Sequence, residues 1–304
     1  MKKILVVGSL NMDISVQVDE MPCAGETVLS KGHAFLPGGK GANQAFACAA
    51  LGAPVMMLGC VGRDDYGDAL IKSLTGAGVD CSLIARRADT ATGMALITVN
   101  EKGENAITVI QGANGVVDKQ YIDDNMDALT ACDIVVVQLE IPMDTVIYTI
   151  QKAKALNKTV IVDPAPAPDY FPDILYGLID ILKPNEHELA KLAGIAQGDI
   201  RGGLRALQKK GAGAIIVTLG ADGALICTED GMCETIAGIE TEVVDTTAAG
   251  DTFTAALAVM LSEGGTMREA VRFANKAASM AVTRRGAQPS IPTRSELRAA
   301  FPEI

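Results

Sequence analysis

The segment V-V-D-T-T-A-A-G-D-T-F-T-A-A-L, residues 243–257, joins an apolar pair typical of a strand end to an alanine-rich run typical of a helix. The small residues Ala248, Ala249 and Gly250 stand directly before that helix. Backbone N–H groups at a helix start lack intrahelical partners and lie at the positive end of the helix dipole, so they can hold an anion. Small side chains let a phosphate approach them. The segment therefore predicts an anion site between a strand and a helix.

Asp251 stands inside this predicted anion site. Its carboxylate would compete with a bound anion, which favours a role facing the hydroxyl of a second reactant across a transferring phosphoryl group. An Asp N-cap on an ordinary helix explains the same spacing. The segment taken alone leaves both interpretations open.

Outward from this segment, short apolar runs alternate with helical patterns. The apolar runs at 134–138, 160–163, 179–183 and 215–219 are typical of strands buried on both faces. Such alternation predicts an α/β fold with a parallel sheet. Further strands are expected at 4–8, 12–18 and 55–60, a hairpin at 224–237, and helices at 40–51, 66–76, 250–262, 267–284 and 293–301.

Polar-faced strands near residues 12–36 and 92–110 are the candidates for a second unit. We expect one domain over residues 1–304, with these discontinuous segments forming a small lid over the carboxyl edge of the sheet, where open α/β sheets place their ligands. Extra strands of the central sheet would show the same periodicity, so this alternative stays open.

Composition excludes several classes of partner. Among 304 residues, 37 Asp and Glu against 26 Lys and Arg give a net charge of −11, which argues against nucleic acid or an anionic membrane surface. Residues 45–62 carry no charge, but Gly-Ala-Pro at 52–54 divides them into a helix and a strand. The seven cysteines are scattered without C-x-x-C spacing. We therefore expect a soluble, cytoplasmic protein with reduced thiols and no thiolate zinc site.

Polar side chains follow several predicted strands. Asn11 and Asp13 come directly after the first strand, and Glu140 ends a later one. The carboxyl ends of parallel strands meet at one sheet edge, so these side chains predict a binding crevice. Asn11 and Asp13 taken alone fit an exposed turn equally well.

The segment G-G-K-G-A-N, residues 38–43, opens a predicted helix. It is not a Walker A phosphate loop, because Lys40 is followed by glycine rather than Ser or Thr. The glycines let a ligand approach the backbone, and Lys40 and Asn43 supply polar groups suited to a polyol. A glycine-rich helix entry is the structural alternative.

Two later segments suit a nucleotide. Asn185 and Glu188 open a helix with the spacing N-x-x-E, which fits a capping box and also fits residues that organise the waters of a nucleotide-bound Mg²⁺. Residues 218–223, T-L-G-A-D-G, follow another strand and provide flexible backbone that could lie along a nucleotide.

Two of these segments together resemble the signatures of the PfkB carbohydrate kinase family. Residues 38–45, continuing to 59–62 and 65–67, are similar to the first signature, and residues 245–253 to the second. Segments at 8–13, 22–28, 138–140, 164–167, 183–186 and 285–290 extend the resemblance over essentially the whole chain. It implies a central, mostly parallel β-sheet flanked by helices on both faces, with a small β-sheet lid that pairs across a homodimer.

The resemblance also implies roles for individual residues. Asp251 would be the catalytic base, with Ala248, Ala249 and Gly250 as the anion hole; the family often carries glycine where Ala248 stands. The implied sugar contacts are Asn11, Asp13, Gly39, Lys40, Gly41, Ala42, Asn43, Glu140 and Asp251. The implied nucleotide pocket is Asn185, Thr218, Leu219, Gly220, Ala221, Asp222, Gly223, Gly250 and Asn275. Mg²⁺ bound with ATP is implied at Asn185 and Glu188, and an activating K⁺ at Asp245, Thr247, Ala281, Arg284, Gly286 and Ser290.

The activity implied is transfer of a phosphoryl group from ATP to the 5-hydroxyl of D-ribose. One alternative is a kinase of the same family acting on deoxyribose, another sugar or a nucleoside. Asn11 and Asp13 favour a small polyol, whose hydroxyls they can pair with. Another alternative is a non-catalytic sugar-binding regulator, which would have no need of Asp251, the small-residue anion hole and the N-x-x-E pair together.

Overall fold

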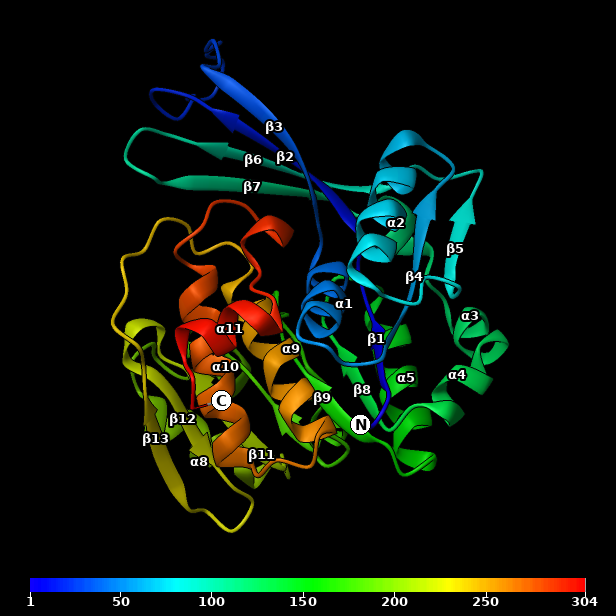
Figure 1. Ribbon diagram of the computed structural model, residues 1–304, viewed down its shortest axis with the longest axis vertical. Helices are drawn as coiled ribbons and strands as arrows, with labels where there is room; N and C mark the ends of the chain where they lie inside the picture. The colour runs from blue at the N-terminus through cyan, green and yellow to red at the C-terminus, as the bar shows by residue number, and fades with distance from the viewer. Residues whose placement is uncertain (304) are drawn as a thin grey trace.

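The computed structural model of the protein describes residues 1–303 and contains two β-sheets (Figure 1). The larger sheet is parallel from β5 to β11 and ends in the antiparallel hairpin β12–β13. Its strands, in spatial order, are β13 (Cys233–Ala237), β12 (Gly223–Cys227), β11 (Ala214–Thr218), β10 (Ile181–Leu182), β9 (Thr159–Val162), β8 (Ile134–Val137), β1 (Ile4–Val7), β4 (Val55–Gly62) and β5 (Ile84–Arg87). The predicted mostly parallel sheet is therefore confirmed.

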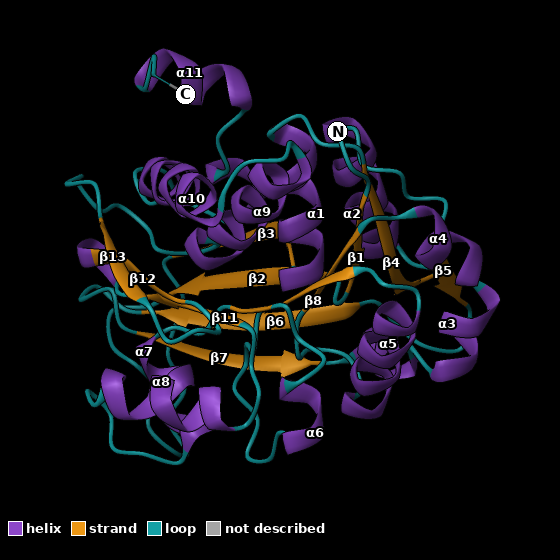
Figure 2. Cartoon of the chain, turned by 90° about the horizontal axis from the view of Figure 1, so that it is seen from below, coloured by secondary structure: helices purple, strands orange, loops and turns teal. Residues whose placement is uncertain are grey.

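Helices cover both faces of this sheet (Figure 2). Alternate residues of one strand enter opposite layers, since Ile4 and Val6 pack in one hydrophobic cluster and Leu5 and Val7 in the other. The first layer contains α1 (Lys40–Ala50), α2 (Asp65–Ala77), α9 (Ala249–Ser262), α10 (Met267–Ala281) and α11 (Arg294–Ala300). The second contains α3 (Lys119–Asp124), α4 (Met126–Ala131), α5 (Met143–Ala155), α6 (Asp173–Tyr176), α7 (Glu186–Ala193) and α8 (Ile200–Lys209). Short 3₁₀ turns are η1 (Gly112–Val116), η2 (Gly220–Asp222) and η3 (Gln288–Ser290).

The smaller sheet extends away from the layered body, at the top of Figure 1. Its order is β3 (Gly32–Gly38), β2 (Asn11–Gln17), β6 (Gly93–Val99) and β7 (Asn105–Ile110). The β2–β6 pair is parallel, whereas β2–β3 and β6–β7 are antiparallel. The segments near 12–36 and 92–110 thus form a sheet of their own rather than extra strands of the central sheet.

Several elements differ from the sequence-based expectation. The strand expected at 179–183 is reduced to Ile181–Leu182, and the helix expected at 267–284 ends at Ala281. The structure joins Cys227 and Cys233 in a disulfide, so the expectation of wholly reduced thiols is wrong for this pair. These two cysteines are direct cross-strand partners at the end of the β12–β13 hairpin. Over residues 1–303, no helix is both long and apolar enough to cross a bilayer.

Candidate active site

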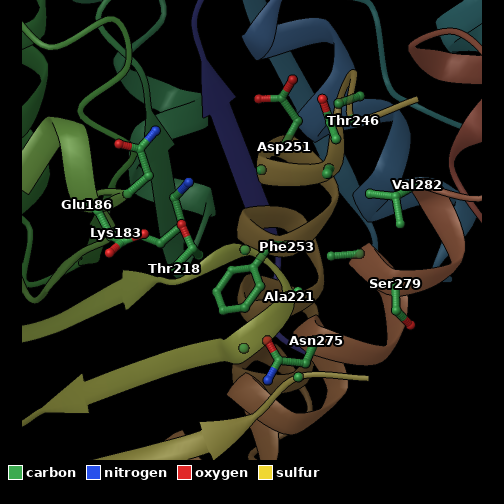
Figure 3. A pocket seen from close by; sticks show the side chains of 18 of the residues that line it. Lys183, Glu186, Thr218, Ala221, Thr246, Asp251, Phe253, Asn275, Ser279 and Val282 are labelled. Carbon is green, nitrogen blue, oxygen red and sulfur yellow. The ribbon is translucent and has the colours of Figure 1, made fainter. Parts of the chain in front are cut away.

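A cavity of about 690 Å³ lies at the carboxyl ends of β9, β10 and β11, beside the first turn of α9. In Figure 3, Thr246 and Asp251 lie at one end of this cavity and Asn275 at the other, with Phe253 between them. The apolar lining residues are concentrated on α9, α10 and the segment before α9: Ile239, Val243, Phe253, Ala278 and Val282. The cavity therefore has a polar end and a more apolar end.

The polar end is the N-terminus of α9. Ala248 is the N-cap residue and has a φ of 59°, a left-handed conformation that lets the chain turn sharply into the helix. Within the described chain, the amides of Gly250 and Asp251 have no protein acceptor, whereas the amide of Ala249 donates to the Thr246 carbonyl at 3.2 Å. Two free amides at the positive end of a 14-residue helix are the groups that the predicted anion site requires.

Asp251 does not cap this helix, because the helix has no side-chain capping hydrogen bond and its N-cap residue is Ala248. Its carboxylate is only 6% exposed and accepts from Asn43 Nδ2 at 2.9 Å and Gln44 Nε2 at 3.0 Å. Burial raises the pKa of Asp251, and the negative charge of Asp163 adds to this shift. The positive charge of Lys40 and the hydrogen bonds from the Asn43 and Gln44 side chains lower the pKa. Asn43 Oδ1 is buried and has no partner within residues 1–303, so it can accept a ligand hydroxyl.

Asn11 and Asp13 open β2, so both belong to the small sheet. Asn11 Oδ1 accepts from Asn114 Nδ2 at 2.7 Å, which fixes the orientation of its amide. Burial, followed by the negative charges of Glu140 and Asp251, raises the pKa of Asp13 to about 7, and Lys40 opposes this shift. A Cβ on Gly38 would meet Asp13 Oδ2, and a Cβ on Gly39, where φ is 87°, would lie 2.6 Å from the Asn11 nitrogen. The two glycines are required for this close approach.

Glu140 and Ser9 connect the start of α1 to the strand ends. Glu140 Oε2 accepts from Ser9 Oγ at 2.5 Å and from the Lys40 amide at 3.3 Å. The Ser9 carbonyl oxygen accepts from the backbone amide of Ala42 at 2.9 Å, and the Ser9 hydroxyl oxygen accepts from the backbone amide of Gly41 at 3.4 Å. These buried amides hold α1 against the turn after β1. A sugar contact by Gly41 and Ala42 stays a prediction.

A buried polar network that the sequence-based expectation missed lies under Asp251. Gln44 Nε2 bonds both Asp251 and Asp163, the latter at 2.9 Å, and Gln44 Oε1 accepts from Gln138 Nε2 at 2.6 Å. Asp163 is also 3.2 Å from Lys183 Nζ. Asp163 and Lys183 directly follow β9 and β10, so position at a strand end could have identified them. Gln44 lies inside helix α1, so it has no position at a strand end that could have marked it as a site residue.

Asn185 and Glu188 confirm the capping box considered for them, and their role towards Mg²⁺ stays a prediction. They form a capping box at the start of α7, with reciprocal bonds of 2.8 Å, and both line the cavity. Burial raises the pKa of Glu188, whereas Lys183 lowers it. A single buried carboxylate next to an Asn suits the outer shell of a hydrated Mg²⁺ better than an all-protein cage. In residues 1–303 there is no cluster of three or more His, Cys, Asp or Glu side chains suited to a metal.

The remaining predicted nucleotide residues lie around the same cavity. Thr218, Gly220, Ala221, Gly223, Gly250 and Asn275 line it. Asn275 Nδ2 also donates to the carbonyls of Ile236 and Ala237, at 3.2 and 3.1 Å, which ties α10 to the end of β13. Leu219 instead packs against the hydrophobic cluster of the second layer, and Asp222 is exposed in η2.

The two loops predicted to hold a monovalent cation meet beneath α9. Asp245 accepts from the Thr247 amide at 2.9 Å and hydroxyl at 2.6 Å, and from the Gly286 amide at 2.8 Å. Burial alone would raise the pKa of Asp245, but these donors lower it, so the group is held ionised. The Arg284 side chain pairs with Glu296, and Ser290 donates to the Ala287 carbonyl. Backbone carbonyls of the two loops are the groups that suit K⁺ here, together with Asp245.

The site combines a helix start with two free amides, a buried carboxylate beside these amides, and polar side chains on both sides of the carboxylate. A hydroxyl held by Asn11, Asp13 and Asn43 would face Asp251, and an anion on the Gly250 and Asp251 amides would come from the opposite side. Phosphoryl transfer depends mainly on such positioning and on charge stabilisation. The arrangement suits transfer from a nucleotide to a polyol hydroxyl.

Comparisons with known proteins agree with this chemistry. Residues 1–294 match the model of the pfkB family of carbohydrate kinases. The chain is 37% identical to ribokinase of Haemophilus influenzae over 298 residues, covering 97% of each chain, and 35% identical to deoxyribokinase of Salmonella typhi over 294 residues, covering 95% of each. Its structure resembles that of Arabidopsis thaliana ribokinase complexed with ribose and ATP, with a TM-score of 0.91, 35% identity and 98% of each chain covered.

Proposed function

The chain belongs to the pfkB family of carbohydrate kinases, and on that premise we propose that it transfers the γ-phosphoryl group of ATP to the 5-hydroxyl of D-ribose, giving ribose 5-phosphate and ADP. The observation that carries the proposal is the position of Asp251. Its buried carboxylate is held by Asn43 from the sugar side and lies at the free amides of α9. A carboxylate placed there can address a hydroxyl and a phosphoryl group at once.

Asp251 acts as the base that orients the sugar hydroxyl and accepts its proton. Because the transition state of phosphoryl transfer is loose, this proton moves late and an ionised carboxylate suffices. The amides of Asn43 and Gln44 keep the carboxylate fixed and favour its ionised form, against the burial that raises its pKa. The amides of Gly250 and Asp251 stabilise negative charge on the moving phosphoryl group.

Ribose is bound by the groups that converge from the two sheets. Asn11, Asp13 and Asn43 offer amide and carboxylate oxygens to its hydroxyls, and Glu140 and Lys40 close the same side. The nucleotide is surrounded by Asn185, Thr218, Gly220, Ala221, Gly223 and Asn275, with the apolar residues of α9 and α10 facing its base. The small sheet acts as a lid, because Asn11 and Asp13 lie on its strand β2.

Two cations complete the proposed site. Asn185 and Glu188 fit the water shell of a Mg²⁺ carried by ATP, and when bound this ion neutralises phosphate charge. The loops at Asp245, Thr247, Ala281, Arg284, Gly286 and Ser290 hold K⁺ under the anion site. The half-buried carboxylate of Asp245 and the neighbouring carbonyls are oxygen ligands of the kind that such an ion requires.

The small sheet also supports a homodimer. It exposes large apolar side chains on a thin, two-sided element: Phe35, Leu96, Ile107, Val109 and Ile110. Exposed apolar patches of this kind mark interaction sites. We assign the homodimer interface to this sheet.

A panel of ADP-release assays tests the substrate. The protein is incubated with MgATP and K⁺ and with ribose, deoxyribose, fructose or adenosine, and the product is identified by mass spectrometry. We expect the highest kcat/KM for ribose. The similarity to a deoxyribokinase makes deoxyribose the informative competitor, and a higher kcat/KM for it would replace ribose in the proposal. Sugar binding without ADP release would revive the non-catalytic alternative.

A further inference from the structure

Lys183 places a buried positive charge beside the anion-binding end of α9. It follows β10 directly, its side chain is 4% exposed, and it lines the cavity. A Cβ built on Gly250 would lie 3.6 Å from Lys183 Nζ. The ammonium group is therefore a near neighbour of Gly250, whose amide is one of the two free amides at the start of α9.

One carboxylate faces this ammonium group. Across residues 1–303, Asp163 is the one acidic side chain within salt-bridge range of Lys183 Nζ, with 3.2 Å to Oδ1. The other oxygen of Asp163 accepts from Gln44 Nε2 and, at 3.3 Å, from Thr254 Oγ1, so Asp163 is itself fixed. An ammonium group has three donors. Lys183 thus retains donors for a ligand in the cavity.

The charge of Lys183 matches only one part of the proposed ligands. Ribose is neutral and adenine prefers the apolar end of the cavity, whereas the amides at the start of α9 are arranged for an anion. A full positive charge in a buried site acts far more strongly on a phosphoryl group than the same charge in water. We infer that Lys183 is a catalytic residue whose ammonium group binds a non-bridging oxygen of the γ-phosphoryl group during transfer, and that Asp163 is a positioning residue for it.

This inference rests on the proposed phosphoryl transfer and adds a group to it. The sugar oxygen forms a bond to the γ-phosphorus, the bond from that phosphorus to the β,γ-bridging oxygen breaks, and ADP leaves with the electron pair. The hydroxyl proton passes to Asp251. Lys183 keeps its proton throughout and moves with the phosphoryl oxygen, while Asp163 holds the ammonium when the γ-phosphoryl is absent.

Nucleotide binding without sugar provides the test. The dissociation constants of ATP and ADP are measured by calorimetry in Mg²⁺ for the wild-type protein, Lys183→Met, Asp163→Asn and the double variant Lys183→Met/Asp163→Asn. The double variant is needed because Lys183→Met alone leaves a buried, unpaired carboxylate that can unfold the protein. Lys191→Met is the matched control, since Lys191 lies on α7 and pairs with Asp169 at the surface.

We expect both variants that lack Lys183 to bind ATP about tenfold more weakly, with ADP affinity unchanged. Asp163→Asn keeps the ammonium and should keep the preference of the wild-type protein for ATP over ADP. With ribose present, Lys183→Met should lower kcat by about 10²- to 10³-fold, as loss of one transition-state donor does.

A purely structural ion pair would give a different pattern. Asp163→Asn would then lose as much ATP affinity as Lys183→Met, or ATP and ADP would weaken together, and either result overturns the inference. Wild-type turnover in a folded Lys183→Met protein would overturn it as well. If the wild-type protein phosphorylates no sugar of the panel, the proposed function fails, while the contrast between ATP and ADP still decides the role of Lys183.

Discussion

Asp251 illustrates what single residues contribute to this site. Its position before an alanine-rich helix is visible in the sequence, but the choice between a cap and a base is not. The structure shows both carboxylate oxygens accepting from side-chain amides, of Asn43 and Gln44, rather than from backbone at the helix start. The partners come from a segment more than 200 residues away in the chain. Such contacts depend on the fold and cannot be inferred from local spacing.

Asp251→Asn should abolish most turnover while leaving ligand binding intact. The amide keeps the volume of the carboxylate but cannot accept the hydroxyl proton, so we expect kcat to fall by about 10²- to 10⁴-fold. Dissociation constants for ribose and ATP, measured by calorimetry, should stay close to those of the wild-type protein. Near-normal turnover in a coupled ADP-release assay would remove Asp251 as the base.

Asp13 should make the stability of the ligand-free protein depend on pH. Its pKa is about 7 in the folded protein against 3.8 for the free side chain, so between these values the folded state holds a proton that the unfolded state has lost. The free energy of unfolding therefore falls as pH rises through this window, by at most about 1.4 kcal/mol per pH unit. Asp13→Asn removes this contribution.

Urea unfolding of both proteins at pH 5, 6, 7 and 8 measures the effect. The Asn variant should gain stability relative to the wild-type protein as pH rises, with little further gain above pH 7. Raised pKa values at Asp251 and Glu188 occur in both proteins and largely cancel in the comparison. Parallel stability curves would show that Asp13 titrates normally.

At the scale of elements, the sequence predicts the buried strands well because their apolar runs carry the signal by themselves. Strands β1, β4, β8, β9 and β11 begin and end within about two residues of their predicted bounds. Strand β10 is shorter than predicted at both ends, because Ile179, Asp180 and Lys183 share its apolar run or follow it but lie outside the strand. Strand β3 is mostly half-exposed and alternates weakly, and its pairing with β2 depends on tertiary contacts.

The start of α9 is the element on which the anion site depends, and Ala248 sets its geometry. A left-handed backbone costs an L-residue roughly 1–2 kcal/mol, although glycine also loses more entropy on folding. We expect Ala248→Gly to change the free energy of unfolding by less than about 1 kcal/mol and to keep activity. Ala248→Val should destabilise by about 1–3 kcal/mol, because a β-branched residue resists this conformation.

Thermal unfolding and steady-state kinetics of the two variants provide the measurement. If the amides of Gly250 and Asp251 form the anion site, Ala248→Val should also raise the KM for ATP, since it disturbs the turn that presents them. Ala258→Val, a buried substitution farther along the same helix, controls for added volume without touching the turn. Equal effects of both valine variants on the KM for ATP would argue against the anion site.

At the scale of the whole molecule, the two sheets meet at the site. Strand β1 ends in the central sheet and the chain then enters β2, so Asn11 and Asp13 belong to the small sheet while Asp251 and Asp163 belong to the layered body. The sequence predicts two sets of strands but not their relation, since periodicity does not record which strands pair. Opening or closing of the small sheet would therefore change the sugar side of the site and leave the nucleotide side intact.

The small sheet also presents the surface on which the proposed dimer depends. Asp13, Ala95 and Val109 occupy one cross-strand row, so Val109 lies on the same face of the sheet as the sugar-side carboxylate. Ile107 is two residues away on β7 and shares this face, and the two side chains are 56% and 48% exposed. A partner covering them would sit next to the sugar site.

We therefore expect the wild-type protein to be a dimer by light scattering, and Ile107→Glu/Val109→Glu to be a folded monomer with weaker ribose binding and unchanged ADP binding. The introduced glutamates would be buried and would repel each other in the dimer interface. On an exposed strand of the monomer the same charges are tolerated. Thr108→Glu is the matched control, because Thr108 lies between the two residues but points to the opposite face. A dimer that persists in the double variant, or a Thr108→Glu protein that dissociates equally, would place the interface elsewhere. Dissociation without loss of ribose affinity would show that the sugar site is complete within one chain.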